Sequence, residues 1–126
     1  MMAVLDASAL LAFLHDEPGA ARVRDALEGG SVSAVNWAEV VQKASRRGVE
    51  VTGMREEFED IGVVFEPFTP GQAEVAARLW ERTRTRGLSL ADRACLALGM
   101  ERRAAVLTAD REWVELELGV RIILVR

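Results

Sequence analysis

The sequence predicts an α/β fold in which a mostly parallel β-sheet is covered by helices on both faces. Short apolar runs alternate with longer amphipathic stretches along the whole chain, and this alternation is typical of β-α-β units. At 126 residues, 50% of them hydrophobic, the chain is long enough for one core but short for two. We therefore expect a single domain over residues 1–126, with functional groups at the carboxyl ends of the strands.

The strands are predicted from short apolar runs that are rich in β-branched residues or flanked by turn residues. The opening run Ala-Val-Leu, at residues 3–5, is ended by Asp6, which makes it a buried strand with a polar residue at its carboxyl end. Right-handed crossovers between such strands give a parallel sheet. Strands are expected at residues 3–5, 31–35, 63–66, 105–108 and 120–125.

The helices are predicted where apolar residues recur with helical spacing behind a start signal. Pro18 suits the first position of the second helix, and Asn36 is expected to cap the third. Thr69 followed by Pro-Gly-Gln combines an N-cap threonine, a proline at the first helical position and a glutamine three residues after the cap, so a long helix should run until Gly87 ends it. The expected helices cover residues 7–14, 18–29, 37–48, 52–61, 70–86 and 89–102, with a short helix after Asp110.

Three acidic residues follow predicted strands and therefore face one edge of the sheet. Asp6 comes directly after the first strand, Glu39 lies one turn into the helix after the second, and Asp110 comes two residues after the fourth. Periodicity alone does not bring Asp92 to this edge, because its helix follows another helix. Two unit charges about 4 Å apart at an effective dielectric of about 20 repel by roughly 4 kcal/mol, so converging carboxylates must protonate or bind cations.

Helix capping is the alternative explanation for each acid taken alone. Asp6 and Asp110 suit N-cap positions, and Glu39 and Asp92 each stand three residues after a capping residue. Carboxylates in a first helical turn are favoured by the helix dipole and need no further function. Only the cluster as a whole favours a divalent-metal site.

Oxygen ligands of this kind favour Mg²⁺ or Mn²⁺ over zinc. Ser8 and Thr108 stand two residues from Asp6 and Asp110, close enough to hydrogen-bond a carboxylate or a metal-bound water, and equally able to satisfy a helix terminus. The single histidine, His15, is expected at an exposed helix end, and it excludes a paired-histidine mechanism within one chain. A Gly-Lys-Ser/Thr phosphate loop is also missing from the sequence.

The net charge of −4 argues against a passive electrostatic binder of nucleic acid. Residues 78–103 hold seven arginines and three acids, a pattern of either a solvated helix face or a basic rim around a site. The only cysteine, Cys95, has no partner for an internal disulfide, so a reducing, cytoplasmic location is expected. The opening apolar stretch is too short to span a bilayer, so no membrane association is expected.

Four motifs occur in order along the chain: VLDASALLAFLHDEPGA at the start, SAVNWAEVVQKASRRG around Glu39, GLSLADRACLALG around Asp92 and VLTADREW around Asp110. In these motifs the sequence resembles the PIN-domain nucleases, and within them the short VapC-type toxins of prokaryotic toxin–antitoxin pairs. The resemblance covers essentially the whole chain. It implies a five-stranded parallel sheet flanked by helices, with the four acids gathered in one pocket and Ser8 beside them.

The resemblance also implies a reaction, the metal-assisted hydrolysis of RNA by an endonuclease that leaves 3′-hydroxyl and 5′-phosphate ends. Asp6, Asp92 and Asp110 are then the residues that hold one or two Mg²⁺ or Mn²⁺ ions. Glu39 binds metal or assists deprotonation of the attacking water, and Ser8 belongs to the same catalytic group.

Partners follow from the resemblance as well. RNA is the implied substrate, with Arg93 and Arg111 as candidate contacts to its backbone, and a homodimer and a cognate antitoxin protein are implied. Two alternatives within the same fold stay open: a catalytically silent binding protein, and a nuclease that processes RNA without being a toxin. A phosphorylation-controlled receiver module fits less well, because Ala7 rather than a second acid follows Asp6 and the sole lysine is Lys43.

Overall fold

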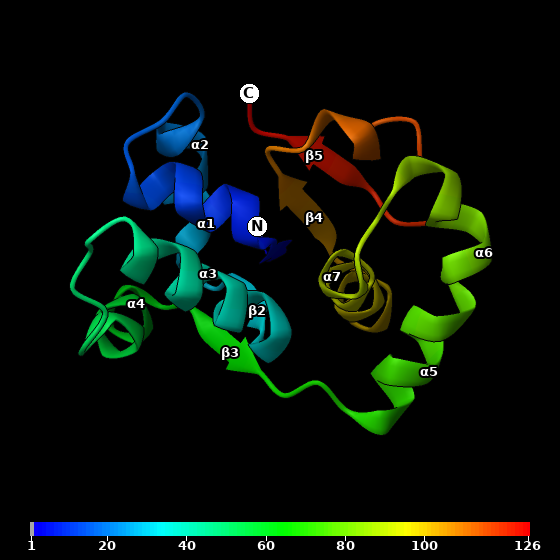
Figure 1. The fold of residues 1–126 in the computed structure, drawn as a ribbon, viewed down its shortest axis with the longest axis horizontal. Helices are drawn as coiled ribbons and strands as arrows, with labels where there is room; N and C mark the ends of the chain where they lie inside the picture. Colours follow the sequence, from blue (N-terminus) through cyan, green and yellow to red (C-terminus); the bar gives the residue numbers. More distant parts are fainter. Residues whose placement is uncertain (1) are drawn as a thin grey trace.

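The centre of the molecule is a five-stranded sheet in which every neighbouring pair of strands is parallel (Figure 1). We describe residues 2–126 from a computed structural model. The strand order is β3-β2-β1-β4-β5, so the α/β class and the five-stranded parallel sheet expected from the sequence are confirmed. The strands are β1 (Ala3–Leu5), β2 (Ser31–Ser33), β3 (Val64–Glu66), β4 (Ala105–Thr108) and β5 (Ile122–Leu124).

The two central strands, β1 and β4, send alternate side chains into two separate cores. Val4 lies opposite Val106 in the β1–β4 register, and both belong to the core on one face of the sheet. Leu5 and Leu107 pair in the same register and belong to the core on the other face. Because side chains alternate along a strand, three apolar residues in a row are enough to fix β1 between two helical layers.

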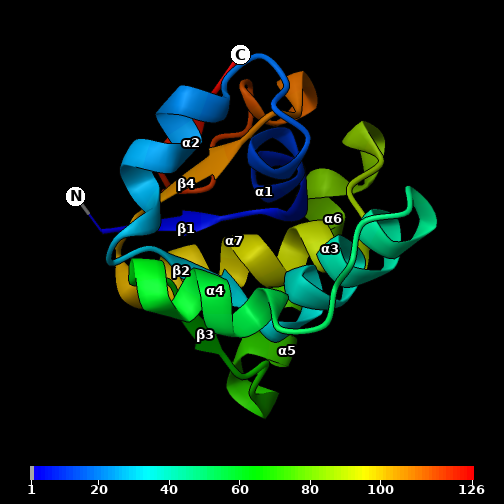
Figure 2. The same cartoon turned by 90° about the vertical axis from the view of Figure 1, so that its left-hand side faces the viewer.

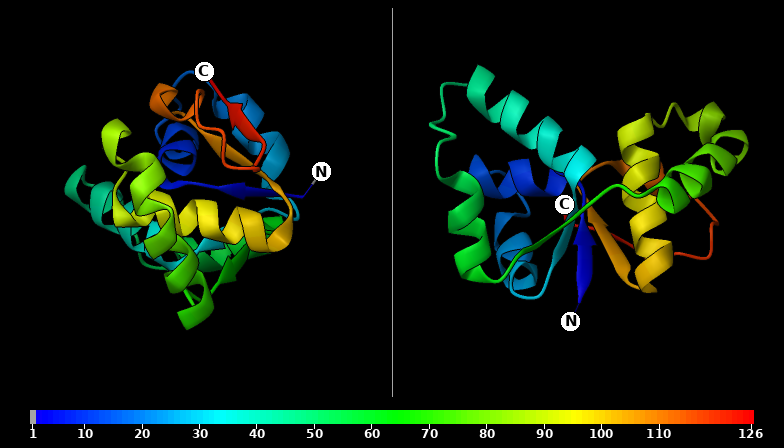
Figure 3. Two further views of the ribbon diagram at one scale, coloured as in Figure 1. Left: turned by 90° about the vertical axis from the view of Figure 1, so that its right-hand side faces the viewer. Right: turned by 90° about the horizontal axis from the view of Figure 1, so that it is seen from below.

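Helices cover both faces of the sheet, as expected. Figure 2 shows α1 and α2 on one side of β1 and α7 on the other, and the right panel of Figure 3 shows the blue and yellow helices separated by the central strands. One face carries α1 (Ala7–Leu14), α2 (Ala20–Leu27), α3 (Ala34–Arg46) and α4 (Met54–Ile61). The other carries α5 (Pro70–Arg78), α6 (Trp80–Thr83), α7 (Leu90–Arg102) and the 3-10 turns η1 (Arg84–Arg86) and η2 (Arg111–Trp113).

The second, third and fourth helices begin later or earlier than the sequence predicts, and the fourth, expected from residue 52, begins at Met54 after the left-handed Gly53. The second helix begins at Ala20 and not at Pro18, because Gly19 precedes it with a left-handed φ of 96° that is incompatible with a helical turn. The third begins at Ala34, because β2 ends at Ser33 and the Ser33 hydroxyl accepts a hydrogen bond from the Val35 amide at 3.3 Å. Asn36, the predicted cap, therefore lies inside the first turn of α3.

The single long helix predicted over residues 70–86 is divided into α5, α6 and η1. Thr69 does cap α5, as expected, by accepting from the Gln72 amide at 3.1 Å. Thr83 is fully buried, and its hydroxyl donates to the Leu79 carbonyl at 2.8 Å. Hydrogen bonds of this kind bend helices, and Leu79 is the residue at which α5 gives way to α6. Within residues 2–126, every helix is too short or too polar to cross a lipid bilayer.

Candidate active site

The order of the strands reverses between β1 and β4. The chain runs outward from β1 through β2 to β3, then returns to the other side of β1 as β4. At such a switch point the connections leave the carboxyl ends of two adjacent strands in opposite directions and open a crevice, which is where parallel α/β sheets bind ligands. A pocket of about 740 Å³ lies at this edge.

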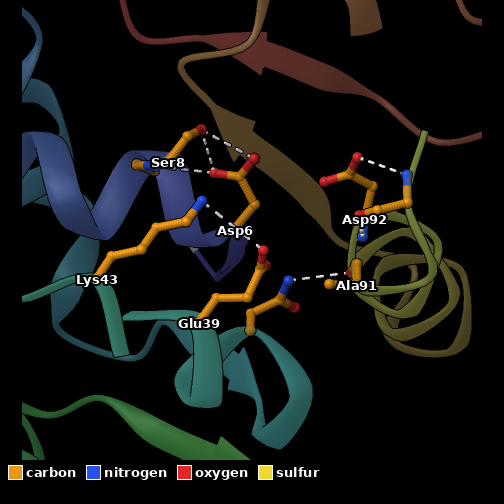
Figure 4. A network of polar contacts seen from close by, with 9 residues as sticks. Asp6, Ser8, Glu39, Lys43, Ala91 and Asp92 are labelled. Atoms are coloured by element: carbon orange, nitrogen blue, oxygen red, sulfur yellow. Dashed lines mark hydrogen bonds and ion pairs between the residues drawn. The ribbon is translucent and has the colours of Figure 1, made fainter. Parts of the chain in front are cut away.

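The four acidic residues identified from the sequence line this one pocket, together with Ser8. Asp6 precedes α1, Glu39 lies on α3, Asp92 is in the first turn of α7 and Asp110 precedes η2. Figure 4 shows the carboxylates of Asp6, Glu39 and Asp92 directed toward a common space. Asp92 reaches the edge because α7 packs against β1, β2 and β4, a tertiary contact that the periodicity of the sequence does not reveal.

The carboxylate of Asp6 is held by three neighbours. Its Oδ1 accepts from the Ala9 amide at 2.8 Å and from the Ser8 hydroxyl at 2.8 Å. Its Oδ2 accepts from the Thr108 hydroxyl at 2.6 Å and lies 2.9 Å from the same Ser8 oxygen. Asp6 is only 3% exposed, so these hydrogen bonds replace the water that the charged group gives up on burial.

Two hydroxyls connect Asp6 to the end of β4. The Ser8 oxygen accepts from the Ala109 amide at 2.9 Å, and the Thr108 oxygen accepts from the Asp110 amide at 3.0 Å. Each hydroxyl thus accepts one hydrogen bond from a backbone amide just after β4 and donates one hydrogen bond to the Asp6 carboxylate. Of the alternatives open for Ser8 and Thr108, the structure shows the hydrogen bond to a carboxylate, with Asp6 as the acceptor for both.

The pKa of Asp6 is raised from 3.8 to about 6. Burial is the main cause, because it disfavours the charged carboxylate. The hydrogen bonds from Thr108, Ala9 and Ser8 oppose this shift, and the negative charge of Asp92 adds to it. A cation in the pocket would relieve both the burial penalty and the repulsion between the two carboxylates.

Three of the four acids also cap helices, as the alternative explanation expected. Asp6 caps α1 through Ala9. Asp92 and Ser89 form a reciprocal capping box on α7, with distances of 2.9 and 3.1 Å. Asp110 accepts from the Glu112 amide at 2.9 Å. The same three carboxylates therefore cap helices and line the pocket.

Glu39 has no capping role. The expected capping box with Asn36 is wrong, because α3 begins at Ala34 and places Glu39 beyond its first turn. Its carboxylate lies 3.9 Å from the Lys43 ammonium, one turn further along α3 (Figure 4). This exposed pair holds Glu39 only weakly, so the carboxylate remains available to the pocket.

Asn36 joins the two helices that carry Glu39 and Asp92, and the sequence reading assigned it only a capping role. Its Nδ2 donates to the carbonyl of Ala91, the residue before Asp92, at 3.0 Å, and the side chain is 1% exposed. The spacing of residues along α3 indicates that the Asn36 side chain is buried. Asn36 stands four residues before Val40, so it lies on the buried face of the helix, where a polar side chain needs a partner.

The basic residues of the pocket are not the ones predicted. Arg93 and Arg111 do not line it, and the Arg93 guanidinium instead donates to the Ala76 carbonyl on α5 at 2.8 Å. Contact of Arg93 and of Arg111 with the RNA backbone stays a prediction. The arginine-rich stretch 78–103 contributes no cation to the pocket, which takes its basic lining from Lys43, Arg46, Arg47 and Arg126.

The residues present suit a hard divalent cation, because the pocket offers carboxylate and hydroxyl oxygens. Within residues 2–126, no three acidic, histidine or cysteine side chains stand close enough to form a ligand set by themselves. Mg²⁺ is usually held by one or two carboxylates together with water and substrate phosphate. The pocket fits an ion bound in this open manner, and it does not fit a closed cage made of protein ligands alone.

Comparison with protein families gives a match to the PIN domain over residues 3–117. The match includes all four pocket acids and every strand except β5. The chain belongs to the PIN domain family. No curated protein sequence gives a significant match to this PIN domain.

Solved structures resemble this PIN domain over nearly its whole length. A toxin–antitoxin complex from Klebsiella pneumoniae has a TM-score of 0.77 at 18% identity, covering 98% of each chain. FitAcB from Neisseria gonorrhoeae has a TM-score of 0.74 at 19% identity, covering 98% of each chain. Mycobacterium tuberculosis VapC20, a sarcin–ricin-loop-cleaving toxin, has a TM-score of 0.69 at 15% identity, covering 94% of this chain and 98% of that one. At these identities the likeness establishes a shared fold.

Proposed function

We propose that this PIN domain is a divalent-metal-dependent endoribonuclease that acts as the toxin of a toxin–antitoxin pair. The observation that carries the proposal is the pocket lined by Asp6, Glu39, Asp92 and Asp110, at the switch point between β1 and β4. Membership of the PIN domain family supports the nuclease activity. The toxin role is supported by the similar structures from Klebsiella pneumoniae and Mycobacterium tuberculosis.

In this mechanism Asp6, Asp92 and Asp110 hold one or two Mg²⁺ or Mn²⁺ ions. When bound, such an ion makes a water more acidic and neutralises charge on the phosphate. Ser8 keeps the Asp6 carboxylate oriented through its hydrogen bond. Glu39 contributes a further ligand or accepts the proton of the attacking water. The water oxygen joins phosphorus as the bond to the 3′ oxygen breaks, which leaves 3′-hydroxyl and 5′-phosphate ends.

The proposed partners follow from the charge of the site. RNA is the substrate, and a cognate antitoxin protein inhibits the enzyme by placing a basic or apolar segment over the acidic pocket. A basic segment suits this task because the acids attract it where the divalent ion would otherwise bind. We further propose that the protein works as a homodimer in the cytoplasm.

Removal of the metal tests the activity. We expect purified protein, free of antitoxin, to cut single-stranded RNA with Mg²⁺ or Mn²⁺, to stop when the ion is chelated, and to recover when Mn²⁺ is restored. Denaturing gels and analysis of the new 5′ ends provide the measurement. Asp60→Asn, an exposed acid on α4, is the control and should cut like the parent. Cleavage that persists in chelator contradicts the proposal, and metal binding without cleavage favours a silent PIN-fold binding protein.

Asn36→Ala tests whether the link between α3 and α7 positions the site. Loss of the part-buried hydrogen bond to the Ala91 carbonyl should cost about 0.5–1.5 kcal/mol of stability. We expect RNA cleavage to fall by roughly 10–100-fold, as for other groups that orient metal ligands.

Gln72→Ala is the matched control for Asn36→Ala. Gln72 is also a buried amide, and it donates to Glu101 at 3.0 Å, which joins α5 to α7 without lining the pocket. It should lose stability while keeping its activity per folded molecule. Equal activity of the two variants, measured on protein shown to be folded, would leave Asn36 with a purely structural role.

A further inference from the structure

The pocket continues from the acids into a basic region, which we call the basic lobe and define as Lys43, Arg46, Arg47 and Arg126. The α3 members follow Glu39 along the same helix. At 1.5 Å rise per residue, Arg46 stands about 10 Å further along the helix axis than Glu39. The basic lobe therefore begins beside the acids and leads away from them.

The cations of the basic lobe come from two distant parts of the chain. Positive charge at the carboxyl end of α3 has a local explanation, because the helix dipole favours cations there. That explanation does not apply to Arg126, which follows β5 and lines the same pocket. Convergence of charges from separate elements on one concavity is the arrangement expected of an anion-binding site.

Three of the four cations in the basic lobe have an acidic partner, Glu39 for Lys43 and Glu17 for both Arg47 and Arg126. Glu17 is its one acidic neighbour in the pocket lining outside the four acids, and it lies 3.7 Å from Arg47 and 3.1 Å from Arg126. These pairs are between partly exposed side chains and are weak. Within residues 2–126, Arg46 makes no ion pair within 4.0 Å. A phosphate could therefore engage the arginines through charge-assisted hydrogen bonds without breaking a strong interaction.

His15 adds a polar group to the same part of the pocket. It was expected to be exposed, yet it is only partly exposed, lines the pocket, and has an Nε2 atom that is buried without a partner among residues 2–126.

We propose that the basic lobe binds a phosphate of the RNA strand that neighbours the scissile one, with Arg46 and Arg47 as the principal contacts. This inference rests on the proposed function, since it takes RNA as the substrate. The RNA backbone then binds to arginines at the end of α3 and not to the arginine-rich stretch 78–103. Phosphate contacts position a strand without reading its sequence, so the basic lobe sets the register of the RNA over the acids.

The test is the binding of a labelled, short single-stranded RNA, measured by fluorescence anisotropy in EDTA so that cleavage does not interfere. The double variant Arg46→Ala/Arg47→Ala is expected to raise Kd by about tenfold or more at low salt. Loss of this phosphate contact should also reduce the slope of log Kd against log salt by about 0.7. Both arginines are exposed, so the variant should fold, and circular dichroism verifies this.

Arg55→Ala/Arg78→Ala is the matched control, because it removes two exposed arginines that lie outside the pocket. It should bind RNA like the parent, and Arg46→Lys/Arg47→Lys should keep most of the salt dependence. Unchanged Kd and slope in Arg46→Ala/Arg47→Ala would overturn the inference and favour a protein-binding role for these arginines. Failure of the parent to bind RNA would also overturn it.

Cleavage assays on the same preparations separate this inference from the nuclease proposal. A parent that binds RNA through Arg46 and Arg47 but cuts no RNA with Mg²⁺ or Mn²⁺ would refute the nuclease activity alone. A parent that cuts RNA while the double variant binds it equally well would refute the role of the basic lobe alone.

Discussion

Asp6→Asn is expected to abolish RNA cleavage and to stabilise the protein at neutral pH. A metal that stabilises charge on the reacting phosphate contributes several kcal/mol, so loss of this ligand should lower activity by at least about 10³-fold. Although the substitution lowers activity, it should raise stability. Burial raises the pKa of Asp6 from 3.8 to about 6, which means that the charged carboxylate destabilises the folded protein at neutral pH. Asparagine remains a good N-cap for α1, and it carries no charge to desolvate.

The pH dependence of this stabilisation follows from linkage. The folded state holds the Asp6 proton more tightly than the unfolded state, so its stability is highest below about pH 4 and declines until the pH exceeds about 6. This shift in the pKa of Asp6 corresponds to a change of at most roughly 3 kcal/mol in the free energy of unfolding. Asp6→Asn should therefore melt higher than the parent at about pH 7.5, with the gain disappearing near pH 4. Equal destabilisation at both pH values would show that the carboxylate serves only to hold the structure.

Thr108→Val is expected to raise the pKa of Asp6 further. Among the groups that lower that pKa, the Thr108 hydroxyl contributes most, and it donates to Oδ2 at 2.6 Å. Valine keeps the shape but leaves the buried carboxylate short of a donor, which should cost about 1–3 kcal/mol at neutral pH. The part of this loss that comes from the charged carboxylate should shrink below about pH 4, whereas the loss of the acceptor for the Asp110 amide lowers stability at every pH. The acidic limb of the pH–activity profile should move to higher pH.

Thr83→Val is the matched control for Thr108→Val. Thr83 is also fully buried, but its hydroxyl donates to a neutral backbone carbonyl, that of Leu79. Its loss should cost about 0.5–1.5 kcal/mol at every pH and leave the pH–activity profile in place. If both variants showed the same pH dependence, the hydroxyl of Thr108 would have no specific effect on Asp6.

Much of the fold follows from local features of the sequence. The run of residues 3–5 with Asp6 behind it defines β1 and the start of α1, and the Thr69 capping signal defines the start of α5. In a parallel sheet the carboxyl ends of the strands and the amino ends of the helices lie at one edge, so three of the acids that cap helices also face the pocket.

The remaining features depend on contacts between distant segments. Asp92 reaches the site because α7 packs across the central strands, and no local pattern reports that packing. Asn36 was read as a cap because asparagine favours such positions, whereas Ser33, at the end of β2, takes that role. The basic lobe was missed because charge density along the chain points to residues 78–103, while Arg126 joins the residues of α3 only in three dimensions.

The most direct measurement is anomalous diffraction from crystals of the protein soaked in Mn²⁺. We expect a manganese peak inside the pocket, in contact with Asp6, Asp92 or Asp110 and with its coordination completed by water, and no such peak in Asp6→Asn. Manganese bound only outside the pocket, or none at all at concentrations that support RNA cleavage, would contradict the proposed metal site.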